Sequence, residues 1–359
     1  MQFKSASLNE LDQVIGLSIE TFKPNMKEQF RLLFSANNLD HMMIAKDQEI
    51  VVSEVNYYPS TIQIPNASIK VASIGSVCTK IDYRGKQIAS QLLLMAEAQM
   101  LKEHIGLTII SGDLGIYERF GARDVGHMHQ FTLHSSHHLT KHPYHYRVYQ
   151  PSDLKVMQDL YQSEDIRFDR SESEFETLFL GQTYPDTYCK YPTYIITKHE
   201  IPVAYMILSV YVDDDFIKIK EFAGNRQACA FVIPDLLKLH QKSKITWVVP
   251  PKDKIHDFLV DMPYSVITQR ATLKINHLGY FFQSIEPYIL SMFKSFCIIE
   301  SSQTEIKLSI ANQTITLNQE LALKMVLSGK THLRSKSVLQ FVHTCFPLPM
   351  PWTHNLNYQ

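Results

Sequence analysis

The chain has 359 residues, of which 45% are hydrophobic and 11% aromatic, so it can bury more than one core and predicts two or three domains. Its 35 Lys and Arg residues balance 36 Asp and Glu residues. We therefore expect no nucleic acid partner, because phosphate binding depends on surplus positive charge.

The N-terminus and the cysteines predict where the protein resides. The first residues are polar where a signal peptide has an apolar core, and no run approaches the roughly 20 apolar residues of a membrane span. The five cysteines stand singly and form no CxxC pair, as is usual for free thiols in a reducing compartment. These features predict a soluble cytoplasmic protein without a membrane partner.

Residues 1–145 alternate between patterns typical of strands and of helices. A short N-terminal strand precedes a helix over 10–22, capped by Ser7 or Asn9, and a second helix over 26–35. A strand that follows is expected to end at Pro59. In chain order we expect strands at 41–46, 49–59 and 70–81, a helix at 88–104, a strand at 106–112 and a short helix after 115.

The same order begins again after about 140 residues. The segment around Tyr146 resembles the segment around Phe3, and Leu154 corresponds to Leu11. Two copies of one α/β unit are therefore predicted. From Ala271 the pattern changes to an apolar helix, two strand-like runs, a further helix and a proline-rich stretch, which predict a small third domain.

The clearest chemical signal lies between residues 73 and 126. A predicted strand is broken at Arg84-Gly85-Lys86-Gln87-Ile88-Ala89, and a long helix starts at once. Such a turn points backbone N–H groups toward an anion at the helix N-terminus, and the two basic residues add positive charge. Farther along, Tyr117 follows a second strand. This pattern predicts a diphosphate site with a phenol nearby.

These pieces resemble the signature of the GNAT superfamily of acetyltransferases. That signature is Arg or Gln, two residues, Gly, one residue, then Gly or Ala, between the fourth strand and the third helix. Arg84 and Ala89 occupy its first and last positions, and the segment IYERFGA is similar to the family's YxxxG-like segment. Gln87 stands where glycine is usual.

The whole chain resembles the enhanced-intracellular-survival (Eis) family. Its members join a catalytic GNAT domain, a second GNAT domain without a cofactor loop, and a sterol-carrier-like C-terminal domain. The resemblance implies these three domains at residues 1–145, 146–270 and 271–359, hence an α/β (α+β) protein. The loop 224–230 of the second copy lacks the glycine spacing and is expected to be structural only. Relatives assemble as hexamers, which suggests a homo-oligomer.

The resemblance also implies acetyl-CoA as the co-substrate and assigns residues to it. The backbone of one strand pairs with the pantetheine arm and polarises the thioester carbonyl; its residues are Val77, Cys78 and Thr79. The loop holds the diphosphate; its residues are Arg84, Gly85, Lys86, Gln87, Ile88, Ala89 and Ser90. Tyr117 is the general acid for the departing CoA thiolate, which suits a phenol with an ordinary pKa of about 10.

The end of the chain is the second catalytic element that the resemblance implies. In this family the terminal carboxylate reaches the active site and serves as base for the amine, which here assigns that role to Gln359. Tyr358 would fill the aromatic position at which relatives end, with Gln359 as an extra residue. The alternative is a frayed terminus.

We predict an enzyme that transfers acetyl from acetyl-CoA to the primary amine of a small molecule or of lysine, by direct attack in a ternary complex. The alternative is a non-catalytic protein that binds CoA or a lipid-like ligand on the same fold. No metal is expected. The histidines between residues 127 and 145 are interpreted as solvated rather than ligating, and Asp213-Asp214-Asp215 as a solvated turn.

Overall fold

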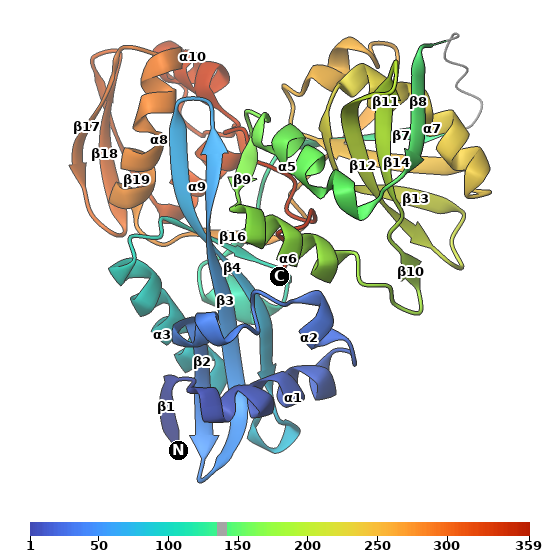
Figure 1. The fold of residues 1–359 in the computed structure, drawn as a ribbon. Coiled ribbons are helices and arrows are strands. Elements are labelled where there is room, and N and C mark those ends of the chain that lie inside the picture. The colour runs from blue at the N-terminus through green and yellow to red at the C-terminus, as the bar shows by residue number, and fades with distance from the viewer. Residues whose placement is uncertain (135–141) are drawn as a thin grey trace. The chain divides into compact units, whose positions relative to one another are not determined.

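The computed structural model describes residues 1–134 and 142–359. These residues form two compact units (Figure 1). Unit 1 comprises Met1–His127, Thr268–Pro349 and Asn357–Gln359, and unit 2 comprises Met128–Ile267 and Met350–Leu356. Both combine sheets with helices, which confirms the predicted α+β class. Within the described part of the chain, no helix has the length and apolar character needed to cross a membrane.

The first segment of unit 1 contains six strands and four α-helices. They are β1 (Gln2–Ser5), α1 (Leu11–Thr21), α2 (Met26–Gln29), β2 (Met42–Asp47), β3 (Ile50–Ile64), β4 (Ala67–Thr79), α3 (Ile88–Lys102), β5 (Leu107–Ile110), α4 (Gly115–Arg119) and β6 (Arg123–Asp124). The strands lie in the order β1-β2-β3-β4-β5-β16-β6, where β16 (Thr272–Ile275) comes from the second segment of the unit. Of these neighbouring strands, only β4 and β5 run parallel.

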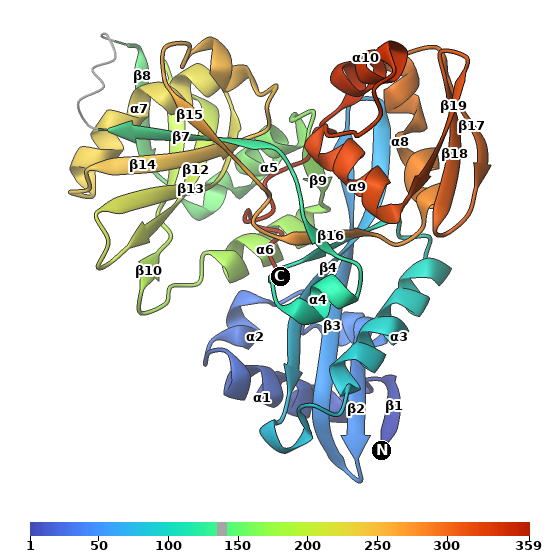
Figure 2. The same ribbon diagram turned by 180° about the vertical axis from the view of Figure 1, so that it is seen from behind.

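Helices cover both faces of this sheet. Successive side chains of β2 alternate between two cores, since Met43 packs in the core under α3 and Met42 in the core under α1 and α2. The two helix layers are therefore on opposite sides: α1 lies in front of the sheet in Figure 1, and α3 lies in front of it in Figure 2.

A β-bulge interrupts the long ladder between β3 and β4. The register shifts between Val55 and Asn56, and Ser76 on β4 adopts a left-handed backbone with φ of 53°. The extra residue bends the strand and re-aims the side chains near its end, as bulges do. Beyond this point β4 also loses its second neighbour, because β5 pairs only with Val71–Ile74.

The rest of unit 1 forms a small α+β layer after β16. It contains α8 (Leu278–Met292), the antiparallel sheet β17-β18-β19 (Phe296–Ser301, Glu305–Ile310, Gln313–Asn318), α9 (Gln319–Ser328) and α10 (Lys336–Cys345). Helix α8 packs on β4 of the main sheet. The run expected as one strand over 305–317 is a hairpin, because Ala311 and Asn312 both adopt the left-handed conformation of a tight turn.

Unit 2 has a sheet with the same layout. Its elements are β7 (Met128–His134), β8 (Tyr144–Val148), α5 (Leu154–Gln162), β9 (Arg167–Asp169), α6 (Glu172–Gln182), β10 (Cys189–Lys190), β11 (Thr193–Lys198), β12 (Ile201–Tyr211), β13 (Phe216–Gly224), α7 (Arg226–Leu239), β14 (Lys244–Val249) and β15 (Tyr264–Ile267). The sheet order is β8-β11-β12-β13-β14-β7-β15, and β13–β14 is the parallel pair.

The two sheets correspond strand for strand, with the parallel pair in the same place. Helices α1 and α5 begin at Leu11 and Leu154, and each follows a short 3-10 helix whose final acid accepts from the backbone three residues earlier. The correspondence noticed between Leu11 and Leu154 in the sequence is therefore a structural one.

Two expected elements were wrong in length. The helix expected over 26–35 ends at Gln29, because Phe30 and Phe34 turn into the core beside α1, and tertiary packing outweighs helix propensity. Strand β3 continues through Pro59, which pairs with Ala72. Since β2 pairs with β3 only as far as Asn56, the missing N–H of the proline costs no bond to β2.

Candidate active site

The loop between β4 and α3 has two residues in the left-handed region. Gly85 has φ of 76°, and Gln87, the N-cap of α3, has φ of 60°. A Cβ at Gly85 would meet nothing within 4 Å, so the backbone and not crowding makes glycine suitable there. At Gln87 the same conformation costs a non-glycine residue about 1–2 kcal/mol, which explains why glycine is usual at this motif position. The preference for glycine therefore needs no clash between the Gln87 side chain and a bound diphosphate to explain it.

The N-terminus of α3 is open to a ligand. No side chain caps it, so the first N–H groups of the helix remain available. Arg84 is held beside them, since its Nε donates to the Thr79 carbonyl at 3.1 Å. Lys86 instead places its Nζ 4.8 Å from the centre of the Tyr83 ring. Backbone donors, the helix dipole and one arginine together form a site for an anion.

A cavity of about 800 Å³ lies over this loop. Nine of the ten residues predicted to bind the cofactor line it, and Lys86 is the one that does not: the nine are Val77, Cys78, Thr79, Arg84, Gly85, Gln87, Ile88, Ala89 and Ser90. Thr21 and Phe22 at the end of α1 form one wall, and Leu114, Ile116 and Arg119 around α4 form another.

The end of β4 presents a free backbone edge beside this cavity. Val77, Cys78 and Thr79 pair with β3 on one side, and β5 does not extend to them on the other. An unpaired strand edge can take an extended ligand through main-chain hydrogen bonds. The geometry therefore suits a linear amide-containing chain that leads from the anion site into the sheet.

Tyr117 lies in α4, packed in the core between the sheet and α3 and nearly buried. Its ring covers Gly112, where a Cβ would come within 2.8 Å of Cε2. Its hydroxyl makes no hydrogen bond to any described residue. Burial, with a smaller contribution from Cys78, raises the pKa of Tyr117 to about 12, so the phenol is protonated at neutral pH and can donate a proton.

The end of the chain packs against the middle of the same sheet. The Gln359 carbonyl carbon lies 2.6 Å from the position that a Cβ on Gly75 would occupy, and Ser111 Oγ donates to a Gln359 backbone oxygen. Tyr358 is partly buried and packs against the core beside α1, with its ring 6.3 Å from that of Phe30. Since Ser111 and Gly112 are adjacent, the structure brings Gln359 and Tyr117 to the same short segment after β5.

A buried carboxyl that the sequence analysis missed lies on the next strand. Glu54 on β3 is fully buried, and its Oε1 accepts from Ser18 Oγ, from Ser76 Oγ at 2.7 Å and from Cys78 Sγ at 3.2 Å. Burial raises the pKa of Glu54 to about 7, although these hydrogen bonds oppose the shift. The available signal was an acid in the middle of a predicted strand rich in apolar residues, where a charged group is rarely buried.

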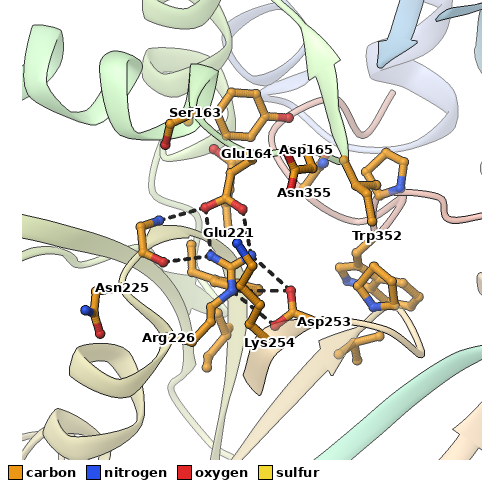
Figure 3. Close-up of a pocket in the computed structure, with 18 of the residues that line it drawn as sticks. Ser163, Glu164, Asp165, Glu221, Asn225, Arg226, Asp253, Lys254, Trp352 and Asn355 are labelled. Carbon is orange, nitrogen blue, oxygen red and sulfur yellow. Dashed lines mark hydrogen bonds and ion pairs between the residues drawn. The ribbon is translucent and has the colours of Figure 1, made fainter. Parts of the chain in front are cut away.

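In unit 2, side chains occupy the N-terminus of α7, the helix that corresponds to α3 (Figure 3). The Asn225 side chain caps α7 by accepting from Ala228 N at 2.9 Å. The Arg226 guanidinium donates to both oxygens of Glu164 at 2.7 Å and to Asp253 at 2.9 Å (Figure 3). A pocket of about 410 Å³ remains in this unit, but its arginine is neutralised by two carboxylates. This loop therefore does not offer the anion site found at α3.

No metal centre was found among the residues that the structure describes, in the sense of three or more His, Cys, Asp or Glu side chains placed to hold an ion. Of the crowded histidines, His129 Nδ1 lies 3.1 Å from His256 Nε2, and His129 stacks on Tyr264. His137 and His138 lie outside the described residues. All five cysteines are free thiols. Cys297 is exposed, and the other four are buried: Cys78, Cys189, Cys229 and Cys345.

Comparisons with known proteins agree with this geometry. Residues 2–124 match a family model described as an acetyltransferase (GNAT) domain. No curated protein matches the sequence. A GCN5-related N-acetyltransferase from Anabaena variabilis superposes with a TM-score of 0.70 at 13% identity, covering 98% of each chain. Eis1 from Mycobacterium abscessus gives a TM-score of 0.63 at 10% identity, covering 96% of each chain.

A third solved structure, a probable N-acyltransferase of unknown function from Enterococcus faecalis, gives a TM-score of 0.63 at 15% identity over 79% of this chain and 74% of its own. At these identities the likeness concerns the fold alone. The loop, the cavity and Tyr117 all lie within the range that the family model matches. Residues 2–124 thus match a family model of a GNAT acetyltransferase domain, and the fold of the chain is similar to that of solved GCN5-related N-acetyltransferases.

Proposed function

We propose that this protein is an acetyl-CoA-dependent N-acetyltransferase that acts on the primary amine of a small molecule or of lysine. One observation carries the proposal: a single cavity in unit 1 joins an uncapped helix N-terminus to a strand end with an unpaired edge. A diphosphate and a pantetheine arm have the charge and shape that these two features accept.

The chain's own residues suit the co-substrate. The N–H groups of Ile88, Ala89 and Ser90, with Arg84, would hold the diphosphate, and the open left-handed turn at Gly85 lets it approach closely. The backbone of residues 77–79 would hold the pantetheine arm. Acetyl-CoA, when bound, supplies an activated acetyl group as a thioester.

Two residues would move protons. The amine nitrogen forms a bond to the acetyl carbon as the carbon–sulfur bond breaks, and the sulfur keeps the electron pair. Tyr117, protonated at neutral pH, would donate its proton to that sulfur. The carboxylate of Gln359, which lies against β4, would accept a proton from the nitrogen. The Gln359 carboxyl would then return its proton, directly or through solvent, to the Tyr117 phenolate, which restores both groups. An ammonium first loses one proton to solvent to become the attacking amine, so one amide, free CoA and one proton form for each ammonium consumed.

The organisation of the chain is part of the proposal. We assign residues 1–145 to a catalytic GNAT domain, 146–270 to a second GNAT domain without a cofactor site, and 271–359 to a sterol-carrier-like domain. The matching sheet orders and the clamped Arg226 support the second assignment. A cytoplasmic location and a homo-oligomer remain part of the same proposal.

The test measures free thiol release and amide product by mass spectrometry, with acetyl-CoA and a panel of amines that includes a polyamine and a lysine peptide. We expect acetylation of at least one amine class, and Tyr117→Phe should lower kcat by about 100-fold or more while still binding acetyl-CoA. Acetyl-CoA binding without product from any amine would favour the alternative, a CoA-binding protein without catalysis.

A further inference from the structure

The cavity of about 410 Å³ in unit 2 has the usual size of a small-molecule site (Figure 3). All the residues that line it belong to that unit. It lies beyond the point where β13 and β14 stop pairing: the ladder covers residues 216–218 of β13, and the cavity is lined by residues 219–222 of that strand and by Val248 and Pro250 from the end of β14. It therefore has the same place in the unit 2 sheet as the cavity beside β4 has in unit 1.

One residue of β13 presents its backbone to this cavity. Asn225 N donates to the Val203 carbonyl at the start of the ladder with β12, at 2.9 Å. Successive residues of a strand direct their backbone groups to opposite sides, so the N–H and C=O of Phe222, three residues earlier, face away from β12 and toward the side of β14. Lys80 ends the ladder of β4 on β3 in the same way, which makes Phe222 the counterpart of Val77.

The neighbouring part of the cavity does not suit a diphosphate. Gly224 N, the next N–H on the same side of β13, donates to Glu164 Oε1 at 2.7 Å. Glu164 and Asp253 also hold the Arg226 guanidinium. A diphosphate in this position would face both carboxylates, so the cavity keeps the strand edge of a CoA site without its phosphate site.

The lining of the cavity has no net charge. It contains four acidic and four basic side chains, and the buried acid among them is fully paired. Glu221 accepts from two N–H groups of Arg170 at 3.0 and 2.7 Å and from Tyr205 Oη at 2.8 Å. Apolar walls come from side chains that include Phe258 and Trp352. A neutral ligand with apolar groups is therefore favoured over an ion, since an added charge would be desolvated without a partner.

We propose that this cavity is a second binding site, which takes a neutral linear molecule with two secondary amides. One amide N–H would donate to the Phe222 carbonyl, and the carbonyl of the other amide would accept from the Phe222 N–H, as in a β-ladder. Pantetheine and an N-acetylated amino acid amide share this chemistry. The site is independent of the proposed acetyl transfer in unit 1.

The tryptophans of the chain make binding at this site measurable. The chain has two, Trp247 and Trp352; both belong to unit 2, and Trp352 lines the cavity. Titration with pantetheine or with N-acetylleucinamide should therefore give a saturable change in tryptophan emission that is lost in Trp352→Phe. The probe with the lower Kd identifies which of the two sources the site serves.

Two comparisons of ligands test the chemistry without changing the protein. Methylation of the acetamide nitrogen of N-acetylleucinamide removes the donor to the Phe222 carbonyl and should raise Kd about 5- to 10-fold. CoA carries the pantetheine amides joined to a diphosphate, and it should bind this site at least about 10-fold more weakly than pantetheine does. Equal affinity for the methylated probe, or for CoA and pantetheine, would overturn the inference.

A pair of variants tests the location. Phe258→Ala removes part of one wall at a half-exposed position and should raise Kd several-fold. Leu239→Ala, at an exposed position of α7 outside the cavity, is the matched control and should bind as wild type. No saturable change with either probe would overturn this inference alone, whereas a wild type inactive on every amine would overturn only the proposed function.

Discussion

At the scale of single residues, backbone conformation explains why glycine is usual in the GNAT motif at the position that Gln87 occupies here. Gln87 occupies a left-handed position that glycine adopts without strain, and no side-chain clash needs to be invoked. What this position requires is a positive φ angle, and in sequences that requirement is visible only as a preference for glycine. Gln87 therefore weakens the fold slightly without removing the N–H groups that the motif provides.

This predicts the behaviour of Gln87→Gly. Relief of the left-handed strain and the greater freedom of glycine in the unfolded chain nearly cancel, so the free energy of unfolding should change by less than about 1 kcal/mol. The Kd for acetyl-CoA should stay equal or fall, as measured by calorimetry. Gln48→Gly is the matched control, since Gln48 has φ of 53° in the turn after β2. Several-fold weaker binding in Gln87→Gly alone would show that the glutamine side chain contacts the ligand.

The loop glycine gives a second prediction. Acetyl-CoA should raise the Tm of the wild type through linkage, and Gly85→Asp should abolish that rise by placing a negative charge beside the diphosphate. Gly16→Asp, at an exposed position of α1 with open space around its Cβ, should leave the rise intact. Gly224 cannot serve as this control, because a Cβ there would lie 2.3 Å from the Val203 carbonyl oxygen. An undiminished rise in Gly85→Asp would place the ligand elsewhere.

The residues of the loop could be predicted because their chemistry is local. Arg84 to Ser90 are consecutive, and a short motif followed by a helix specifies where their N–H groups point. The group around Glu54 could not be predicted, because Ser18, Glu54, Ser76 and Cys78 come from three elements. The register of β3 on β4, shifted by the bulge at Ser76, and the packing of α1 on these strands bring them together.

At the scale of elements, one acid joins the start of α1 to the first two strands. Glu10 Oε1 lies 2.7 Å from Lys4 Nζ on β1 and 2.8 Å from Lys46 Nζ on β2, while Oε2 accepts from Ser7 N at 2.9 Å. Burial opposes ionisation, but these hydrogen bonds together lower the pKa of Glu10 to about 2. The ionised form is therefore the one that stabilises the fold.

The sign of this shift sets a pH-dependent prediction. A lowered pKa contributes stability above the unfolded value of about 4.3, and that contribution is lost as the pH falls toward 2. Glu10→Gln should thus melt several degrees below wild type at pH 7, and the gap should narrow progressively below pH 4 in thermal scans. Glu20→Gln, an exposed acid on the same helix, should show no such gap. A gap independent of pH would mean that packing and not charge carries the effect.

The prediction of elements succeeded where the pattern was regular and failed where packing decided. Helix α3 and strand β2 begin within one residue of the expected positions. One helix was expected between the last strand-like run and the prolines of 346–352, where the structure has two, α9 and α10. Val338, Phe341 and Val342 are nevertheless spaced as on a helix and are buried in α10. Its neighbourhood of prolines in 346–352 obscured the periodicity.

At the scale of the whole molecule, the proposed site includes the last residue of the chain, which packs against β4 of the first segment. Gln359 is buried against Gly75, so residues added after it have no room without moving the tail. A C-terminal tag should lower kcat by about 100-fold and leave acetyl-CoA binding intact, as deletion of residues 358–359 should. The same tag on Met1, which is exposed, is the control.

An internal substitution tests the same placement. Gly75→Ala puts a methyl group where the Gln359 backbone lies, so the tail must shift. It should reproduce the loss of kcat seen with the C-terminal tag. A tagged protein and a Gly75→Ala variant that both keep full activity would remove the terminal carboxylate from the mechanism and leave Tyr117 in place.

The chain order of the strands also determines when the sheet of unit 1 can be completed during translation. The unit 1 sheet has β16 between β5 and β6, yet β16 begins at Thr272, after the main segment of unit 2. A ribosome adds about 5–20 residues per second, so the gap between β6 and β16 lasts on the order of ten seconds. During that interval β5 lacks its neighbour β16, and α8 has not been synthesised. Strand β7 has already been synthesised, but its partners β14 and β15 have not. The unit that begins first during translation is therefore completed last.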